Sequence, residues 1–218
     1  PMFETPLPRR TVLARLAQGA GAALLLPTLT SCGAAPAVAG ASLPLVAPPG
    51  FEPVAFNKAR GNAGAIPASY LPSVNGPGGD AKHLGKHLPY VPAGVSAPAG
   101  WLALMWGDPS KGHARHPNAA RGPKNKDQGH WYNWIRVRKA TAGEAKEAES
   151  TFSDWPLIQP DDSGKYAAEK GDDPAGDGGR NTVYLVALPP DVKTGDTVRI
   201  HAHCLTHGEY VDFLTLPA

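Results

Sequence analysis

Five short segments of the chain combine apolar residues with flanking turn residues, which is the pattern of β-strands. They are residues 101–106 (WLALMW), 130–139 (HWYNWIRVRK), 182–188 (TVYLVAL), 196–204 (DTVRIHAHC) and 209–216 (EYVDFLTL). Several of them alternate polar and apolar residues, as strands with one buried face do. In the fourth segment the alternation places Cys204 on the apolar face and His201 and His203 on the other. The pattern therefore predicts an all-β protein built as an antiparallel β-sandwich.

The composition agrees with short strands joined by many turns. The chain has 218 residues, of which 25 are Gly and 24 are Pro, and only 7% are aromatic. This length suffices for one domain with a real core and additional segments. A net charge of +2 gives no indication of nucleic-acid binding. The two cysteines do not suggest a disulfide framework, because the first of them, Cys32, lies in a segment that is better explained as an export signal.

Residues 1–32 have the layout of an export signal, with basic residues followed by an uncharged, mostly apolar run over 16–31. Arg9 and Arg10, followed by Thr-Val-Leu, resemble a twin-arginine signal, whose pathway carries folded proteins. The run ends in Leu-Thr-Ser-Cys, which resembles a bacterial lipobox with Cys32 as the acylated residue. These features predict export to the periplasm or the outer face of the cytoplasmic membrane, with a lipid anchor. A plain signal peptide and an N-terminal membrane anchor are the alternatives.

Two further segments differ in composition from the predicted strands. Residues 33–50 consist of small and apolar residues with many prolines and no charge, which predicts a flexible tether before a domain over 51–218. Residues 141–181 hold ten acidic residues against three lysines and one arginine. We interpret 141–181 as an acidic insertion, mobile apart from a short helix near 143–150.

The histidines and the second cysteine suggest a metal site. Eight histidines occur in the chain, all within 51–218. Cys204 and His207 form a C-x-x-H pair at the end of a predicted strand, and Gly208 supplies a tight turn. Such pairs occur in zinc sites, in blue copper proteins and by accident. In the last case Cys204 is inert and buried while His207 is exposed.

Four segments in order along the chain together resemble the superoxide reductase family, the iron domain of desulfoferrodoxin and neelaredoxin. They are GKHLPYV (Lys86 and His87), RHPNA (His116), GHWYNWIRV (His130) and CLTHGEY (Cys204 and His207). The resemblance spans residues 86–208, nearly all of the predicted domain. It implies a seven-stranded immunoglobulin-like β-sandwich, in agreement with the predicted strands.

The resemblance also implies a mononuclear iron centre and its chemistry. Four equatorial imidazoles would come from His87, His116, His130 and His207, the axial thiolate from Cys204, and the sixth position would stay open. The implied activity is one-electron reduction of superoxide to hydrogen peroxide, with an external protein as electron donor. Lys86 matches a lysine that would attract the anion and assist its protonation. Residues 82–126 contain seven basic residues and one acidic residue. This excess of positive charge is equally consistent with a site that attracts an anion and with a solvated loop.

Departures from the family pattern leave alternatives open. Gly85 stands where the family often has Glu before the lysine, and the interval between His116 and His130 is longer than usual. That interval leaves His113 as a rival ligand to His116. A blue copper electron carrier needs a weak axial methionine, and none follows His207. A non-catalytic zinc-binding module is the other alternative, although zinc normally takes four ligands.

Overall fold

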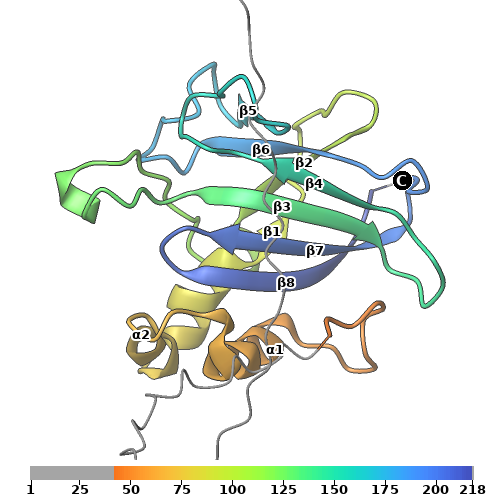
Figure 1. Cartoon of the computed structure of the whole chain (residues 1–218), viewed down its shortest axis with the longest axis horizontal. Helices are drawn as coiled ribbons and strands as arrows, with labels where there is room; N and C mark the ends of the chain where they lie inside the picture. Colours follow the sequence, from red (N-terminus) through yellow and green to blue (C-terminus); the bar gives the residue numbers. More distant parts are fainter. Residues whose placement is uncertain (1–41, 218) are drawn as a thin grey trace, which may run out of the picture. The chain divides into compact units, whose positions relative to one another are not determined.

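The protein is a β-sandwich of two four-stranded antiparallel sheets, as a computed structural model that describes residues 42–217 shows (Figure 1). One sheet has the strand order β1-β2-β6-β5 and the other β4-β3-β7-β8. The strands are β1 (Pro89–Tyr90), β2 (Trp101–Trp106), β3 (Tyr132–Lys139), β4 (Glu147–Thr151), β5 (Lys165–Ala168), β6 (Thr182–Ala187), β7 (Thr197–Cys204) and β8 (Gly208–Thr215). The predicted all-β sandwich and all five predicted strands are confirmed.

The main core lies between the two sheets and is formed by the apolar faces that the alternation predicts. Leu104 and Trp106 of β2 face Ile135 of β3 and Ile200 of β7, and all four are buried. Cys204 belongs to the same core. His201 and His203 lie on the opposite face of β7, where both rings pack against Trp134. The predicted division of β7 into two faces is therefore confirmed.

The acidic segment 141–181 is more ordered than its composition suggests. The helix expected near 143–150 is wrong, because β4 (Glu147–Thr151) pairs there with β3. Later in the segment, β5 (Lys165–Ala168) pairs with β6 in the other sheet. Buried Phe152 and Trp155 attach the segment to the core. Local composition missed these strands because cross-strand pairing and two aromatic anchors outweigh the many acidic and glycine residues around them.

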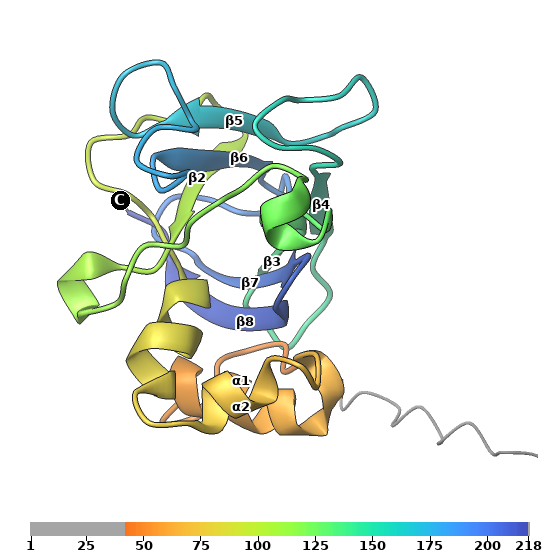
Figure 2. The same ribbon diagram turned by 90° about the vertical axis from the view of Figure 1, so that its left-hand side faces the viewer.

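Helical elements that the sequence did not predict precede the first strand. They are α1 (Pro53–Arg60), α2 (Leu71–Asn75) and the short helical turns Gly61–Ala65, Asp80–Leu84 and Gly85–His87; two further turns, Pro109–Lys111 and Pro123–Asn125, lie between β2 and β3. Figures 1 and 2 show α1 and α2 beside β8, at the edge of its sheet. Their own small core contains Ile66, Val74 and Leu84 together with Tyr210 of β8.

Asn57 of α1 closes the open edge of the β8 strand. Its Nδ2 donates to the carbonyl oxygen of Val211 at 2.7 Å, and its Oδ1 accepts from the backbone N–H of Val211 at 2.8 Å. The Asn57 side chain is fully buried. An unpaired strand edge is otherwise a site for association with other chains. The helices thus satisfy backbone groups of the edge strand while covering it.

Replacing Asn57 with alanine should lower the free energy of unfolding by ~3 kcal/mol, because a buried backbone N–H and carbonyl of Val211 lose their partner. Urea denaturation measures this change. Asn75→Ala is the matched control, since Asn75 makes only an exposed hydrogen bond to Asn62, and it should change stability by less than ~0.5 kcal/mol. Equal effects of the two substitutions would contradict a role for Asn57 at the sheet edge.

The structure describes only the last part of the N-terminal segment, for which an export signal and a tether were predicted. The export signal over 1–32, including Cys32, lies outside the described residues. The end of the predicted tether is described, and it has no helix or strand over 42–50. This part is attached to the sandwich, because Arg199 of β7 donates to the carbonyl oxygen of Pro44 at 3.2 Å. Among residues 42–217, no helix combines the length and the apolar character needed to cross a membrane.

Candidate metal centre

Five side chains from distant parts of the chain meet at one end of the sandwich. His87 ends the helical segment before β1, His116 follows β2, and His130 precedes β3. Cys204 is the last residue of β7, and His207 lies in the turn between β7 and β8. One ligand atom from each of the five lies within 4.8 Å of the ligand atoms of all the others. These are the five metal ligands that the sequence predicted, and together they could hold a metal ion.

The turn between β7 and β8 brings the thiol and the last imidazole together. Cys204 pairs with Gly208 across the hairpin, and the His207 N–H donates to the Cys204 carbonyl at 3.2 Å. Gly208 has φ +86°, and a Cβ there would lie 2.3 Å from the Ala65 carbonyl oxygen. Only glycine fits this conformation and this close approach. Thr206 Oγ1 donates to the Gly129 carbonyl at 2.7 Å, which ties the turn to the loop that carries His130.

The distances from the His207 nitrogen to two other imidazole nitrogens fit coordination at right angles. Nδ1 of His207 lies 3.0 Å from Nε2 of His87 and 3.0 Å from Nε2 of His130. With metal–nitrogen bonds of about 2.1 Å, neighbouring ligands at 90° are ~3.0 Å apart, whereas tetrahedral ligands are ~3.4 Å apart. The sulfur of Cys204 is 3.6 Å from Nε2 of His116 and 3.7 Å from Nδ1 of His207. With a metal–sulfur bond of about 2.3 Å, ligands at 90° would place sulfur and nitrogen ~3.1 Å apart, so the two sulfur distances correspond to a wider angle than the two nitrogen distances.

Burial keeps the imidazoles neutral and thus available as ligands. Burial lowers the pKa of His130 to about 4, and burial with the nearby His130 lowers the pKa of His207 to about 2. The pKa values of His87 and His116 are also well below the ordinary value, chiefly because both rings are buried. Burial raises the pKa of the Cys204 thiol to about 12. The thiol therefore needs a bound cation to become a thiolate.

Aromatic and backbone groups hold two of the imidazoles in place. The Tyr70 ring stacks on His207 with centroids 3.9 Å apart, and the Tyr210 ring stacks on His87 at 4.3 Å. His87 Nδ1 lies 2.7 Å from the carbonyl oxygen of His83, which orients the ring for coordination through Nε2. The sequence analysis missed both tyrosines. Tyr210 could have been found, since it shares the core-facing positions of β8, whereas no pattern marks Tyr70.

Lys86 lies next to the cluster. Its Nζ is 5.5 Å from the centre of the Tyr70 ring, and its side chain is partly buried. Burial lowers the pKa of Lys86, and the neighbouring Cys204 opposes that shift. Lys86 thus carries a positive charge close to Cys204, and its catalytic role stays a prediction.

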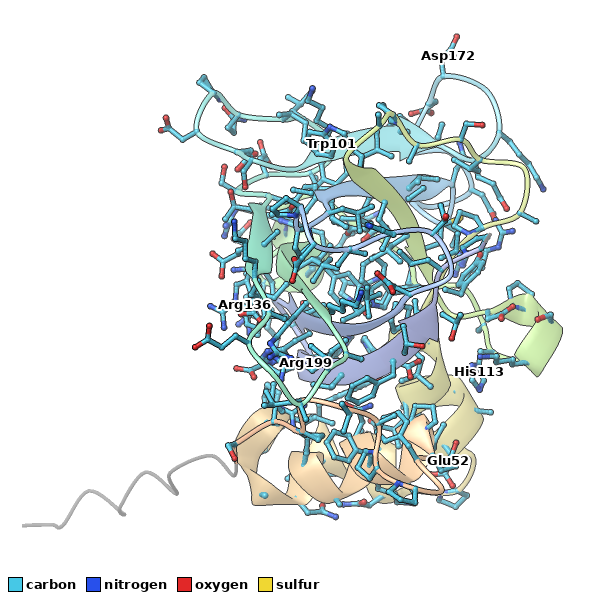
Figure 3. The ribbon with its side chains drawn as sticks, turned by 90° about the vertical axis from the view of Figure 1, so that its right-hand side faces the viewer. Glu52, Trp101, His113, Arg136, Asp172 and Arg199 are labelled. Atoms are coloured by element: carbon cyan, nitrogen blue, oxygen red, sulfur yellow. The ribbon has the colours of Figure 1, made fainter. Side chains whose placement is uncertain are left out.

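His113 is not part of the cluster, so His116 is the histidine of this segment that joins it. Instead the His113 ring packs over Gly85, where a Cβ would lie 2.3 Å from His113 Cδ2. Figure 3 shows His113 on the same side of the sandwich as Glu52, away from Arg136 and Arg199. The glycine before Lys86 therefore has a steric reason, because a side chain there would displace His113.

The remaining histidines have partners outside the centre. His201 Nε2 is 2.8 Å from a carboxylate oxygen of Glu209, and His203 Nδ1 is 2.5 Å from Oδ1 of Asn133. His83 Nδ1 lies 3.0 Å from the hydroxyl of Tyr70 rather than standing free in solvent beside Lys82.

The fold and the side-chain cluster define an all-β protein with a candidate metal centre of four histidines and one cysteine. Comparisons with protein-family models, with curated proteins and with solved structures find no match for this chain.

Proposed function

We propose that this protein is a superoxide reductase with a mononuclear non-haem iron at the cluster. The observation that carries the proposal is the convergence of His87, His116, His130 and His207 with Cys204. The resemblance of four chain segments to the superoxide reductase family supports the same ligand set. Imidazole and thiolate together suit iron, and five donors exceed the four that zinc usually takes.

Bound ferrous iron would supply the electron that reduces superoxide, and an external donor protein would replace that electron. The balance requires two protons for each superoxide that becomes hydrogen peroxide. Around the centre, the neutral imidazoles would add no charge, so the Cys204 thiolate would be the one anionic ligand. Cys204 is fully buried, so water would not reach its sulfur when the metal is bound. Lys86 attracts the substrate anion and helps to organise the delivery of protons.

The blue copper alternative finds no support among the described residues. Met105 packs with Ala103 and Val183 on the face of β2 opposite the main core. Its sulfur accepts a hydrogen bond from Tyr90, 3.6 Å away. The protein thus offers no axial methionine from the described part of the chain, and a copper carrier would leave two of the four histidines without a role.

The cellular location is predicted from residues 1–32, which lie outside the described region. We propose that the chain is exported and anchored to the membrane through an acylated Cys32. Mass spectrometry of the mature protein from membrane fractions tests both points, because acylation adds a defined mass to an N-terminal Cys32.

The decisive experiment measures metal content and superoxide consumption on anaerobically reconstituted protein. We expect one iron per chain and, with a reductant present, one hydrogen peroxide for each superoxide consumed without release of dioxygen. Dismutation would release dioxygen and would contradict the proposal. Zinc would leave the protein colourless, and oxidised copper would be separated from ferric iron by electron paramagnetic resonance.

Lys86→Met should slow the second-order reaction with superoxide by ~10- to 100-fold, because the cation no longer attracts the anion. The loss should shrink as salt is added, since screening weakens the same attraction in the wild type. Stopped-flow measurements at several ionic strengths test this. Lys82→Met is the control, because Lys82 is exposed and lies one helical turn earlier. Equal rates in the two variants would remove Lys86 from the reaction.

A further inference from the structure

A pocket of about 310 Å³ borders the outer side of the metal centre. The residues that line it include Tyr70 and His207, together with Ser69, Lys124, Lys126 and Gln128. The two lysines come from the long interval between His116 and His130, which departs from the family pattern. The pocket is thus formed where the unpredicted helical segment, this interval and the turn after β7 meet.

His207 turns one nitrogen to the metal centre and leaves the other without a protein partner. Nδ1 faces the Nε2 atoms of His87 and His130 at 3.0 Å. Within residues 42–217, no protein atom accepts a hydrogen bond from His207 Nε2. A metal-bound histidine almost always donates its second nitrogen to a carboxylate, a carbonyl or water, as His87 does to the His83 carbonyl. His207 Nε2 is not among the buried side-chain atoms without a partner, so its acceptor is a water molecule or an anion that enters the pocket.

The charge around the pocket favours an anionic acceptor. Lys124 and Lys126 are exposed, and neither forms an ion pair with the described part of the chain. Asp127 lies between Lys126 and Gln128 in the sequence but does not line the pocket. Two unpaired cations next to an unpaired N–H donor leave an excess of positive charge and of hydrogen-bond donors.

We propose that this pocket binds a small dicarboxylate, one end of which accepts a hydrogen bond from His207 Nε2–H. Carboxylate is the group that commonly completes a histidine–metal arrangement of this kind. The ammonium groups of Lys124 and Lys126 bind the second carboxylate, and the Tyr70 ring provides an apolar wall for the methylene groups between them. The inference rests on the metal centre and not on superoxide reduction.

The test is a titration with sodium succinate of the full chain, with and without Zn²⁺, at low ionic strength. Calorimetry gives the affinity, and NMR of ¹⁵N-histidine-labelled protein follows the His207 Nε2–H resonance. We expect saturable binding that shifts this resonance, and a dissociation constant at least tenfold larger for the double variant Lys124→Gln/Lys126→Gln. Lys193→Gln is the matched control, because Lys193 is an exposed lysine at the opposite end of β7.

Several results would overturn the inference. They are the absence of saturable binding, an unchanged affinity in the double variant, and binding that leaves the His207 resonance in place. Neutral succinamide should not bind, and phosphate should bind more weakly than succinate; equal affinity for phosphate would contradict the selection of dicarboxylates. Zinc has no redox chemistry here, so none of these outcomes depends on whether the protein reduces superoxide.

Discussion

Cys204→Ser is expected to abolish the proposed superoxide reduction, with a loss of more than ~100-fold. Changing a residue that only orients a metal ligand already costs up to ~100-fold. The Cys204 sulfur is fully buried and lies 3.6 Å from Nε2 of His116. A serine hydroxyl is of similar shape but is not ionised by a divalent metal as readily as a thiol. The substitution therefore removes the anionic ligand while leaving the sandwich intact.

Two measurements distinguish this outcome from misfolding. The oxidised wild type should show a thiolate-to-iron charge-transfer band that Cys204→Ser lacks, whereas the far-ultraviolet circular dichroism of the two should agree. His203→Gln is the matched control, since His203 neighbours Cys204 in β7 but faces the other side of the sheet. It should keep both the band and the activity. Normal activity in Cys204→Ser would remove the thiolate from the mechanism.

Asp212→Asn is expected to stabilise the protein above pH 7. Asp212 of β8 is buried, and burial raises its pKa from 3.8 to about 7, against the opposing effect of the Phe213 N–H. The folded protein therefore binds a proton more tightly than the unfolded chain between pH 4 and 7. As the pH rises through this window, the free energy of unfolding falls by up to ~4 kcal/mol. Asparagine does not ionise, so this loss should vanish.

Denaturant unfolding from pH 4 to 8 measures the effect. The difference between Asp212→Asn and the wild type should grow with pH and level off above pH 7. The amide oxygen of asparagine can still accept from the Phe213 N–H, which Asp212 Oδ1 does at 2.7 Å. Asp172→Asn is the control, because Asp172 is exposed in the loop after β5 (Figure 3). A pH-independent difference would show that Asp212 has the same pKa in the folded protein as in the unfolded chain.

The strands could be predicted where the hydrophobic pattern is local and strong. The segment Thr197–Cys204 alternates so regularly that its buried and outer faces follow from a period of two. β4 and β5 could not be predicted in this way, because their residues are acidic or small and gain their conformation from partners in β3 and β6. The helical segment before β1 was also missed, since its apolar residues complete a core only when they meet Tyr210.

The candidate ligands were predicted from motif order rather than from geometry. The C-x-x-H pair is local, so the turn between β7 and β8 alone brings Cys204 near His207. His87, His116 and His130 were assigned through the resemblance, and the choice between His113 and His116 stayed open. The tertiary structure decided that choice, because His113 packs on Gly85 while the His116 ring enters the cluster.

By itself, the sequence determined the sandwich, its core-facing residues and the residue types able to hold a metal, since strand periodicity and ligand chemistry are properties of short segments. Only the tertiary structure decided which donors meet, that Tyr70 stacks on His207, and that two lysines face a pocket beside it. The physical reason is that these contacts join residues far apart along the chain, and their distances depend on how the two sheets and the helical segment pack together.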